Sequence, residues 1–439
     1  MYKHLWNLKK INRDNFIIKS IENCYIKKYK LKIFCDDVEE SEAASIKFVR
    51  IYSEVSPEYN PLHKEILNKE PIDVLIKYID LRDSKLKRSG IHQIEKDYDN
   101  EELRYSIRGI LNNIPWIRKI FILMPNEKVR FLKDYNLIKD KIIYVNDKDF
   151  LGHESSNFNA FLFRYWKMKK FGISDNIIIM DDDYFIGKKL QKSDFFYVEN
   201  GKVLPAITTS QFIKIEKKYV KQKCEFFEKK MKTNTEEQNG DEFDYSKFLT
   251  FSFILNLFNN SLNDSMIIPK FTHNAIPVNL NEVKQIYDLV YMSPYKYTTL
   301  DCLYRIYGYI QFQILMFSYT FIKYKRKVKN IPSVFIQLNN SISANYKYPL
   351  FCINKGAGNF SFLNFYKQRI VMEYLFPFQS KYEIIDYSLI NIAFNVTNSM
   401  DNLLRIYEKE KTQMIYKKEF YFLQIIIILN FLFILIKIT

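Results

Sequence analysis

Residues 175–187 read DNIIIMDDDYFIG, an apolar run that ends in three consecutive aspartates. A short run of this kind, bounded by charge, is typical of a strand buried on both faces of a parallel sheet. The adjacent carboxylates of Asp181, Asp182 and Asp183 repel one another, so a cation or water must absorb their charge. In open α/β sheets, ligands bind outside the carboxyl ends of the strands. The stretch therefore predicts a parallel sheet with an acidic ligand site at one edge.

The surrounding segments extend this sheet. Apolar runs at 72–80, 118–124 and 140–146 predict three more strands, and spacings of three and four residues predict a helix over 99–114, capped by Asp99 or Asn100. A second helix is expected over 159–172, with Gly172 as its stop. The order strand, helix, strand, strand, helix, strand indicates an α/β fold with a mainly parallel sheet.

Composition divides the chain into parts. Residues 1–70 form a lysine-rich segment, 71–213 the α/β core, 214–247 a charged insertion with a helix and then a loop, and 248–408 a mainly helical part. Within that last part, residues 271–280 (FTHNAIPVNL) are expected in a loop between two helices.

The end of the chain is strongly apolar. Residues 419–437 are interrupted by few polar side chains and are long enough to predict a single transmembrane anchor. Lysines before this segment favour a body on the cytosolic side, whereas glycans on its N-x-S/T asparagines would place that body in a lumen. We expect a membrane location: Golgi in a eukaryote, otherwise the inner membrane with a cytoplasmic body. The N-terminus shows no cleavable signal peptide.

Charge and cysteine content narrow the classes of function. The 439 residues include 66 Lys and Arg against 50 Asp and Glu, a formal net charge of +16 that attracts phosphate groups. The basic residues form no motif interleaved with aromatics, so no nucleic-acid partner is expected. The five cysteines are scattered and lack a C-x-x-C pair, which signals neither a zinc knuckle nor a disulfide scaffold.

Several polar residues are candidates for chemistry. Hard carboxylate oxygens on Asp182 and Asp183 suit Mg²⁺ or Mn²⁺, which in turn bridges phosphate oxygens. Arg104 and Arg108, one helical turn apart, offer bidentate forks to phosphate, or form an ordinary surface pair. His273 is a candidate general base, although a histidine is more often structural. The alternative for the aspartates is a solvated acidic turn.

In order along the chain, these segments resemble the Stealth family of hexose-1-phosphate transferases. The stretch PIDVLIKYIDLRD is similar to the family's first block and retains Asp73, Asp80 and Asp83. The stretch DNEELRYSIRGILNNIPWIRKIFIL is close to the second block, which continues through Asn159 to Asp182 and Asp183.

The third and fourth blocks are weaker. His273 and Pro277 stand where the third block has H-x-x-x-P, and Asp301 falls near its later R-x-x-x-D, whose arginine is missing. In the fourth block Cys352 and Asn354 are kept, whereas a lysine replaces the expected acid at position 355.

The resemblance implies a Rossmann-like, GT-A-like nucleotide-sugar core over 71–213, completed by 248–408. It implies attack of a glycan hydroxyl on the β-phosphorus of a nucleotide-diphosphate sugar, with a UDP-linked donor, and release of nucleoside monophosphate. The residues to which it assigns roles are His273, Arg104, Arg108 and Asp83 in catalysis; Asp73, Asp80, Asn100, Glu101, Asn159, Asp301 and Asn354 in substrate binding; and Asp182 and Asp183 in metal binding.

Two other functions stay open. A glycosyltransferase with a D-x-D-type metal site would release nucleoside diphosphate instead. A degenerate, membrane-anchored family member would bind donor without turnover, which the missing arginine, Lys355 and Leu81 in place of a glycine favour.

Overall fold

The computed structural model describes residues 32–34, 48–52, 61–80, 101–152, 163–209, 211–233, 239–258, 265–270, 275–292, 310–329, 331, 333–337, 348–354, 369, 372–373 and 375–385. The chain divides into two compact units, one of Met1–Phe360 with Ser380–Ile384 and one of Ser361–Gln379 with Ile385–Thr439. The fold and the site described below belong to the first unit.

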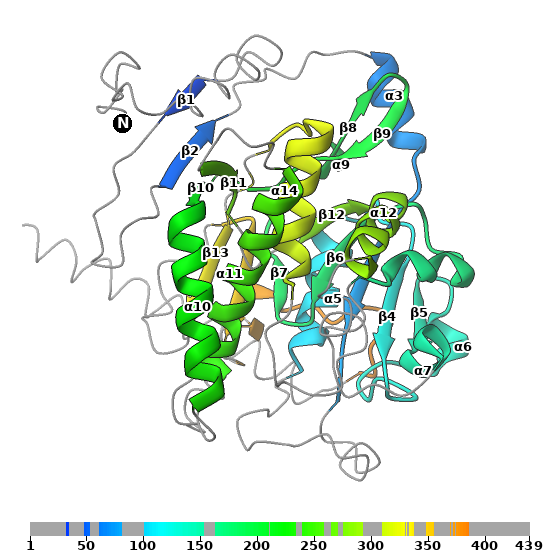
Figure 1. The fold of residues 1–439 in the computed structure, drawn as a ribbon. Helices are drawn as coiled ribbons and strands as arrows, with labels where there is room; N and C mark the ends of the chain where they lie inside the picture. The colour runs from blue at the N-terminus through cyan, green and yellow to red at the C-terminus, as the bar shows by residue number, and fades with distance from the viewer. Residues whose placement is uncertain are drawn as a thin grey trace, which may run out of the picture. The chain divides into compact units, whose positions relative to one another are not determined.

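A five-stranded sheet forms the centre of this unit, in the order β12-β6-β3-β4-β5 (Figure 1). Its strands are β3 (Ile72–Lys77), β4 (Ile120–Met124), β5 (Ile142–Asn146), β6 (Asn176–Asp181) and β12 (Ile276–Asn279). The first four are mutually parallel, and β12 pairs antiparallel with β6 at one edge. The predicted α/β fold with a mainly parallel sheet is confirmed.

Both faces of the sheet are buried, which explains the uninterrupted apolar runs. Successive side chains of a strand point to opposite faces, so Val74 and Ile76 join one core cluster and Leu75 joins the other. Helix α5 (Glu102–Asn113) contributes Leu103 and Ile107 to the first cluster. Helices α12 (Leu280–Tyr291) and α14 (Phe312–Tyr324) contribute to the second.

Smaller sheets surround the central one. The second sheet has the order β1-β2-β10-β11, the third β13-β14-β7 and the fourth β8-β9. Their strands are β1 (Lys32–Phe34), β2 (Phe48–Tyr52), β7 (Tyr184–Ile186), β8 (Phe196–Glu199), β9 (Lys202–Pro205), β10 (Gln211–Glu216), β11 (Ser265–Pro269), β13 (Ser333–Gln337) and β14 (Leu350–Asn354). The other helices are α3 (Pro61–Lys69), α6 (Tyr135–Ile138), α7 (Asp147–Leu151), η3 (Tyr165–Phe171), α9 (Lys192–Phe195), α10 (Lys217–Thr233) and α11 (Asn239–Phe258).

The local predictions differ from the structure in several places. Residues 276–279, expected in a loop, form strand β12, whose Pro277 is tolerated because the strand lies at a sheet edge. The helix expected to end at Gly172 does end there, but as the 3-10 helix η3. In the insertion 214–247, the expected loop gives way to the start of α11, which lies beside α10 (Figure 1).

Two predictions concern the ends of the chain. Residues 48–52 of the lysine-rich segment pair with β10, so this part of the segment shares a sheet with residues 211–216. The predicted anchor at 419–437 lies outside the described residues. Among the helices that the structure does describe, none combines the length and the apolar character needed to cross a membrane.

A tight contact at Gly187 generates a prediction. A Cβ at this position would lie 2.8 Å from a ring carbon of Phe351, whose ring stacks on Phe185. We expect Gly187→Ala to lower the free energy of unfolding by about 1–3 kcal/mol, because overpacking forces side chains from their rotamers. Urea titration measures this loss, and Phe351→Leu in the same chain should restore part of it. Equal losses in the single and double variants would contradict this origin.

Candidate active site at the β3–β6 edge

The strand order reverses between β3 and β6, and we call the carboxyl ends of these two strands the crevice. After β3 the chain adds β4 and β5 on one side and then crosses back to place β6 on the other side of β3. Such a reversal of strand order is the point where open α/β sheets bind ligands, at the carboxyl ends of the strands. The register pairs Lys77, the last residue of β3, with Asp181, the last residue of β6. The three aspartates therefore begin at this crevice.

Lys77 and Asp181 form an ion pair at the crevice. Lys77 Nζ lies 2.9 Å from Asp181 Oδ1, and the two side chains are 16% and 29% exposed. The lysine also acts on Asp183, since its charge favours the ionised carboxylate there. Lys77 was not predicted as a site residue, although a cation as the last residue of an apolar strand indicates one.

Asp183 lies where the chain leaves one sheet for another. Strand β7 begins at the next residue and pairs with β14, which places Cys352 beside Asp183. The Cys352 thiol donates to Asp183 Oδ2 at 3.3 Å. Burial and the nearby Asp181 charge raise the pKa of Asp183 to about 7, and burial raises the pKa of the Cys352 thiol well above its usual value. Cys352, from the fourth block of the resemblance, thus contacts Asp183, from the second block.

The segment after β3 supplies a second carboxylate to the same edge of the sheet. Asp80 is buried and accepts from Arg130 Nε at 2.6 Å and from Nη2 at 2.7 Å. Its backbone N–H donates to Asn126 Oδ1 at 2.9 Å. Asp80 is therefore joined to the loop that follows β4. The structure brings this predicted residue to the expected edge, and Arg130 and Asn126 were not predicted.

The first turn of α5 faces the acidic edge. The helix begins at Glu102, and its N-cap Glu101 adopts the left-handed conformation (φ 59°) that costs a non-glycine residue about 1 kcal/mol or more. Buried Glu102 further raises the pKa of Asp183. The cap is thus one residue after Asn100 and two after Asp99, the two positions that were predicted. A strained backbone at this point fits a site that requires a particular placement of Glu101.

The two predicted phosphate-binding arginines contact a carboxylate that sequence analysis missed. Arg108 Nη2 lies 2.8 Å from Glu383 Oε2, and neither side chain has exposed surface. Arg104 Nη1 lies 3.0 Å from the same oxygen, and its Nε lies 2.9 Å from Glu101 Oε2. Direct contact of Arg108 with a phosphoryl group, expected from the resemblance, is not possible in this arrangement because protein atoms enclose its guanidinium.

Asp73 lies at the other end of the sheet. It occupies the second position of β3, near the amino end, and is fully buried. Arg118 donates to it at 3.0 and 2.5 Å, and the backbone N–H groups of Lys119 and Ser174 donate at 3.0 and 2.7 Å. The structure does not bring Asp73 to the acidic crevice, because Asp73 lies near the start of β3 and the crevice lies at the end of that strand. Its donors make Asp73 a structural bridge, and its predicted role in donor binding stays a prediction.

Of the remaining predicted site residues, one lies within the described ranges. Asn354 ends strand β14. The residues that lie outside the described ranges are Asp83, Asn100, Asn159, His273 and Asp301.

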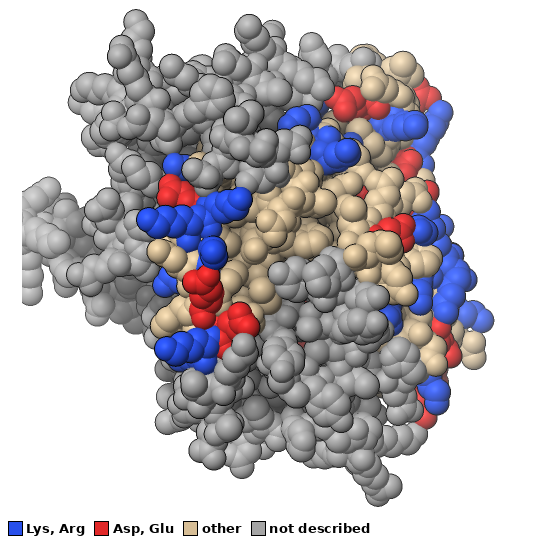
Figure 2. All heavy atoms as spheres, viewed as in Figure 1, with Lys and Arg blue, Asp and Glu red and all other residues tan. Residues whose placement is uncertain are grey.

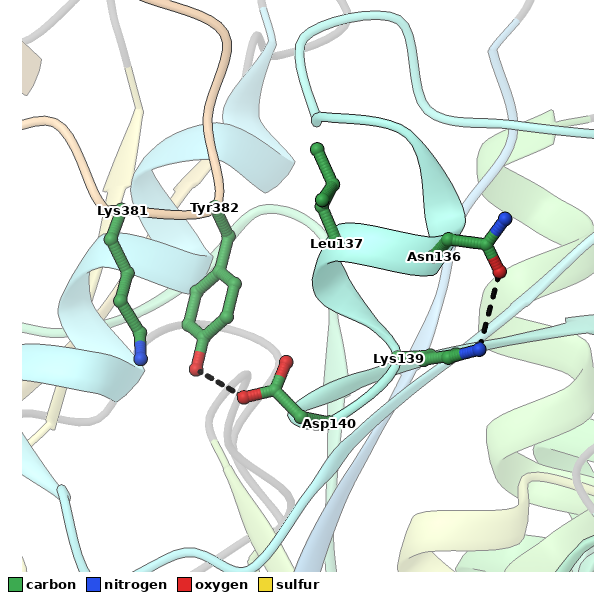
Figure 3. Close-up of a pocket in the computed structure, with 6 residues that line it drawn as sticks. All are labelled: Asn136, Leu137, Lys139, Asp140, Lys381 and Tyr382. Carbon is green, nitrogen blue, oxygen red and sulfur yellow. Dashed lines mark hydrogen bonds between the residues drawn. The ribbon is translucent and has the colours of Figure 1, made fainter.

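A separate surface cavity of about 500 Å³ lies beside α6 (Figure 3). It is lined by Asn136, Leu137, Lys139, Asp140, Lys381 and Tyr382, and the Tyr382 hydroxyl donates to Asp140 Oδ2 at 3.4 Å. None of these residues was predicted. Figure 2 shows basic side chains outnumbering acidic ones along the right-hand edge of the view, in keeping with the net charge of +16.

The donor set at the crevice fits a hard divalent cation bound mainly through a substrate. Across the described ranges, no three His, Cys, Asp or Glu side chains converge as a metal-binding group. Mg²⁺ is commonly held by one or two carboxylates together with substrate phosphates. Asp182 and Asp183 would supply such oxygens. The pKa of Asp183 is raised first by burial and then by the nearby Asp181 charge, and a cation would relieve the second of these.

The aspartates at the end of β6 lie within a region that matches a family model. Residues 96–204 match the family model of Stealth protein CR2, conserved region 2. A capsular polysaccharide phosphotransferase of Actinobacillus suis is 27% identical over 192 residues, which are 36% of this chain and 51% of that protein. The N-acetylglucosamine-1-phosphotransferase subunits alpha/beta of Mus musculus are 29% identical over 181 residues, covering 37% and 14%.

These matches confirm the resemblance to the Stealth family. The chain carries the family's conserved region 2 and is related to proteins named as phosphotransferases. It spans about half the length of the Actinobacillus suis relative. Among solved structures, mouse xyloside xylosyltransferase 1 in its apo form is similar at 11% identity and a TM-score of 0.32, covering 66% of this chain and 99% of that one.

The bonding of Asp73 predicts a loss of stability without a loss of ligand affinity. Asp73→Asn removes a charged acceptor from Arg118, and we expect the free energy of unfolding to fall by about 2–3 kcal/mol. Urea titration measures the change. Nucleotide-sugar affinity of the folded variant should equal that of the wild type. If the variant keeps its free energy of unfolding but binds nucleotide-sugar more weakly, Asp73 belongs to the binding site.

Proposed function

We propose that the chain transfers a hexose-1-phosphate, such as N-acetylglucosamine-1-phosphate, from a UDP-linked or other nucleotide-diphosphate sugar to a glycan or polysaccharide hydroxyl. The observation that carries the proposal is the set of aspartates at the end of β6, inside the Stealth conserved region and next to Lys77 at the β3–β6 reversal. The central sheet then serves as a GT-A-like nucleotide-sugar core. The segment 419–437 would anchor the chain in a membrane.

The chemistry calls for positioning and charge neutralisation rather than covalent help. Asp182 and Asp183 would hold Mg²⁺ or Mn²⁺, and a bound cation would neutralise part of the donor's pyrophosphate charge. Lys77 adds a fixed cation beside the same crevice. Asp80, held by Arg130 and Asn126, lines the adjoining strand end and would orient the donor. His273 remains our candidate base for the acceptor hydroxyl.

Product identity tests the function directly. The full chain is incubated with Mg²⁺, a panel of nucleotide-diphosphate sugars and a glycan acceptor, and the released nucleotide is separated by ion exchange. Nucleoside monophosphate is the expected product, because the acceptor attacks the β-phosphorus. Release of diphosphate would identify a glycosyltransferase. Donor binding with release of neither nucleotide would identify a catalytically inactive relative.

The three aspartates provide matched variants for the metal. Asp182→Asn and Asp183→Asn should each weaken Mg²⁺-dependent donor binding about tenfold to a hundredfold, or about 1.4–2.8 kcal/mol, because each removes a charged ligand. Asp181→Asn is the control, since the Asp181 carboxylate is engaged by Lys77 and should be dispensable for the cation. Isothermal titration with and without Mg²⁺, together with melting temperatures, measures both effects. Equal and metal-independent changes in all three variants would reject the cation site.

A further inference from the structure

Residues 380–384 form a short clasp along the loop that follows β4. Leu132 and Glu383 form an antiparallel bridge. The backbone N–H of Lys133 donates to the Tyr382 carbonyl at 2.9 Å, and that of Ile384 donates to the Phe131 carbonyl at 2.9 Å. A segment from late in the chain is thereby fixed to residues 131–133 by main-chain hydrogen bonds.

The clasp delivers one buried carboxylate to two arginines of α5. Arg108 Nε donates to Glu383 Oε1 at 2.9 Å and Nη2 donates to Oε2 at 2.8 Å, while Arg104 Nη1 donates to Oε2 at 3.0 Å. The backbone N–H of Ser380 adds a donor to Oε1 at 2.8 Å. The hydrogen bonds and charges of these partners outweigh burial and lower the pKa of Glu383, so the carboxylate is ionised at neutral pH.

The clasp thus joins the two elements that bring side chains to the crevice. The loop after β4 holds Asp80 through Asn126 and Arg130, and the Arg104 guanidinium covers the Phe131 ring at 4.5 Å. On α5, Arg104 also holds Glu101, and the adjacent Glu102 acts on Asp183. A shift of Glu383 would therefore be transmitted to both sides of the site.

We propose that Glu383 is a positioning residue, which couples α5 to the loop after β4 and so fixes the donor side of the crevice. In its relation to catalysis this inference rests on the proposed function. Glu383 contacts no substrate in this account and acts through the arginines. Misplacement of reacting groups by about 1 Å can cost on the order of 10²-fold in rate.

Glu383→Gln keeps the shape of the side chain and removes its charge. The matched control is Glu282→Gln. Glu282 is a buried carboxylate on α12 that pairs with the buried Arg326, which follows α14, and neither residue belongs to the clasp or to the loop it covers. Arg104→Lys is a milder variant that keeps the positive charge but reaches fewer of the acceptors on Glu101 and Glu383. It provides the test if Glu383→Gln does not fold.

Hydrogen exchange of the full chain tests the coupling without any need for activity. Glu383→Gln, and to a smaller extent Arg104→Lys, should speed exchange at least fivefold both in residues 101–108 and in residues 126–133, while Glu282→Gln leaves both segments protected. Faster exchange in only one segment, or the same pattern in Glu282→Gln, would show that Glu383 does not couple the two segments.

Kinetics then test the positioning role. If the wild type releases nucleoside monophosphate, Glu383→Gln should lower kcat on the order of 10²-fold at saturating donor, and Glu282→Gln should leave kcat within twofold of the wild type. Unchanged kcat in Glu383→Gln would overturn the positioning role even if exchange rises. A wild type that releases no monophosphate would reject the proposed function, whereas the exchange experiment would still decide whether the clasp couples the two segments.

Discussion

The parallel pairing of β3 with β6 is the constraint on which the candidate site depends. Parallel strands cannot be joined by a tight hairpin and need a crossover connection. Here that connection includes β4 and β5 before the chain returns to place β6 on the free side of β3. The crossovers on the two sides of β3 leave in opposite directions. The carboxyl ends of these two strands are consequently left open to a ligand, and the register sets Lys77 against Asp181 there.

The hydrogen-bond partners of each carboxylate distinguish structural acids from candidate site acids in this sheet. Asp73 accepts from one arginine and two backbone N–H groups, which together match the lone pairs of a carboxylate. Asp183 is half-buried, and burial of its carboxyl group together with the nearby Asp181 charge raises its pKa to about 7. A fully bonded carboxylate stabilises the fold, whereas one opposed by like charges is typical of a ligand site. The two ends of the sheet therefore differ in the electrostatic surroundings of their carboxylates.

Sequence alone predicted the parts of this architecture that depend on local pattern. The apolar runs identified β3, β4, β5 and β6, and the spacing of Leu103 and Ile107 identified α5. Strand β12 was missed because an edge strand of four residues with a proline carries little periodicity. The position of Asp73 near the start of its strand already indicates that it lies far from a site at the carboxyl edge.

Other residues depend on contacts that no local pattern contains. Glu383 lies far along the chain from Arg108, so nothing in the helix sequence indicates which carboxylate neutralises its buried arginines. Cys352 reaches Asp183 only because β7 leaves the central sheet and pairs with β14. Both partners lie beyond residues 96–204, which match the Stealth conserved region. A buried arginine deprived of its carboxylate costs about 3–5 kcal/mol, so that region depends on later segments of the chain to bury Arg108 at all.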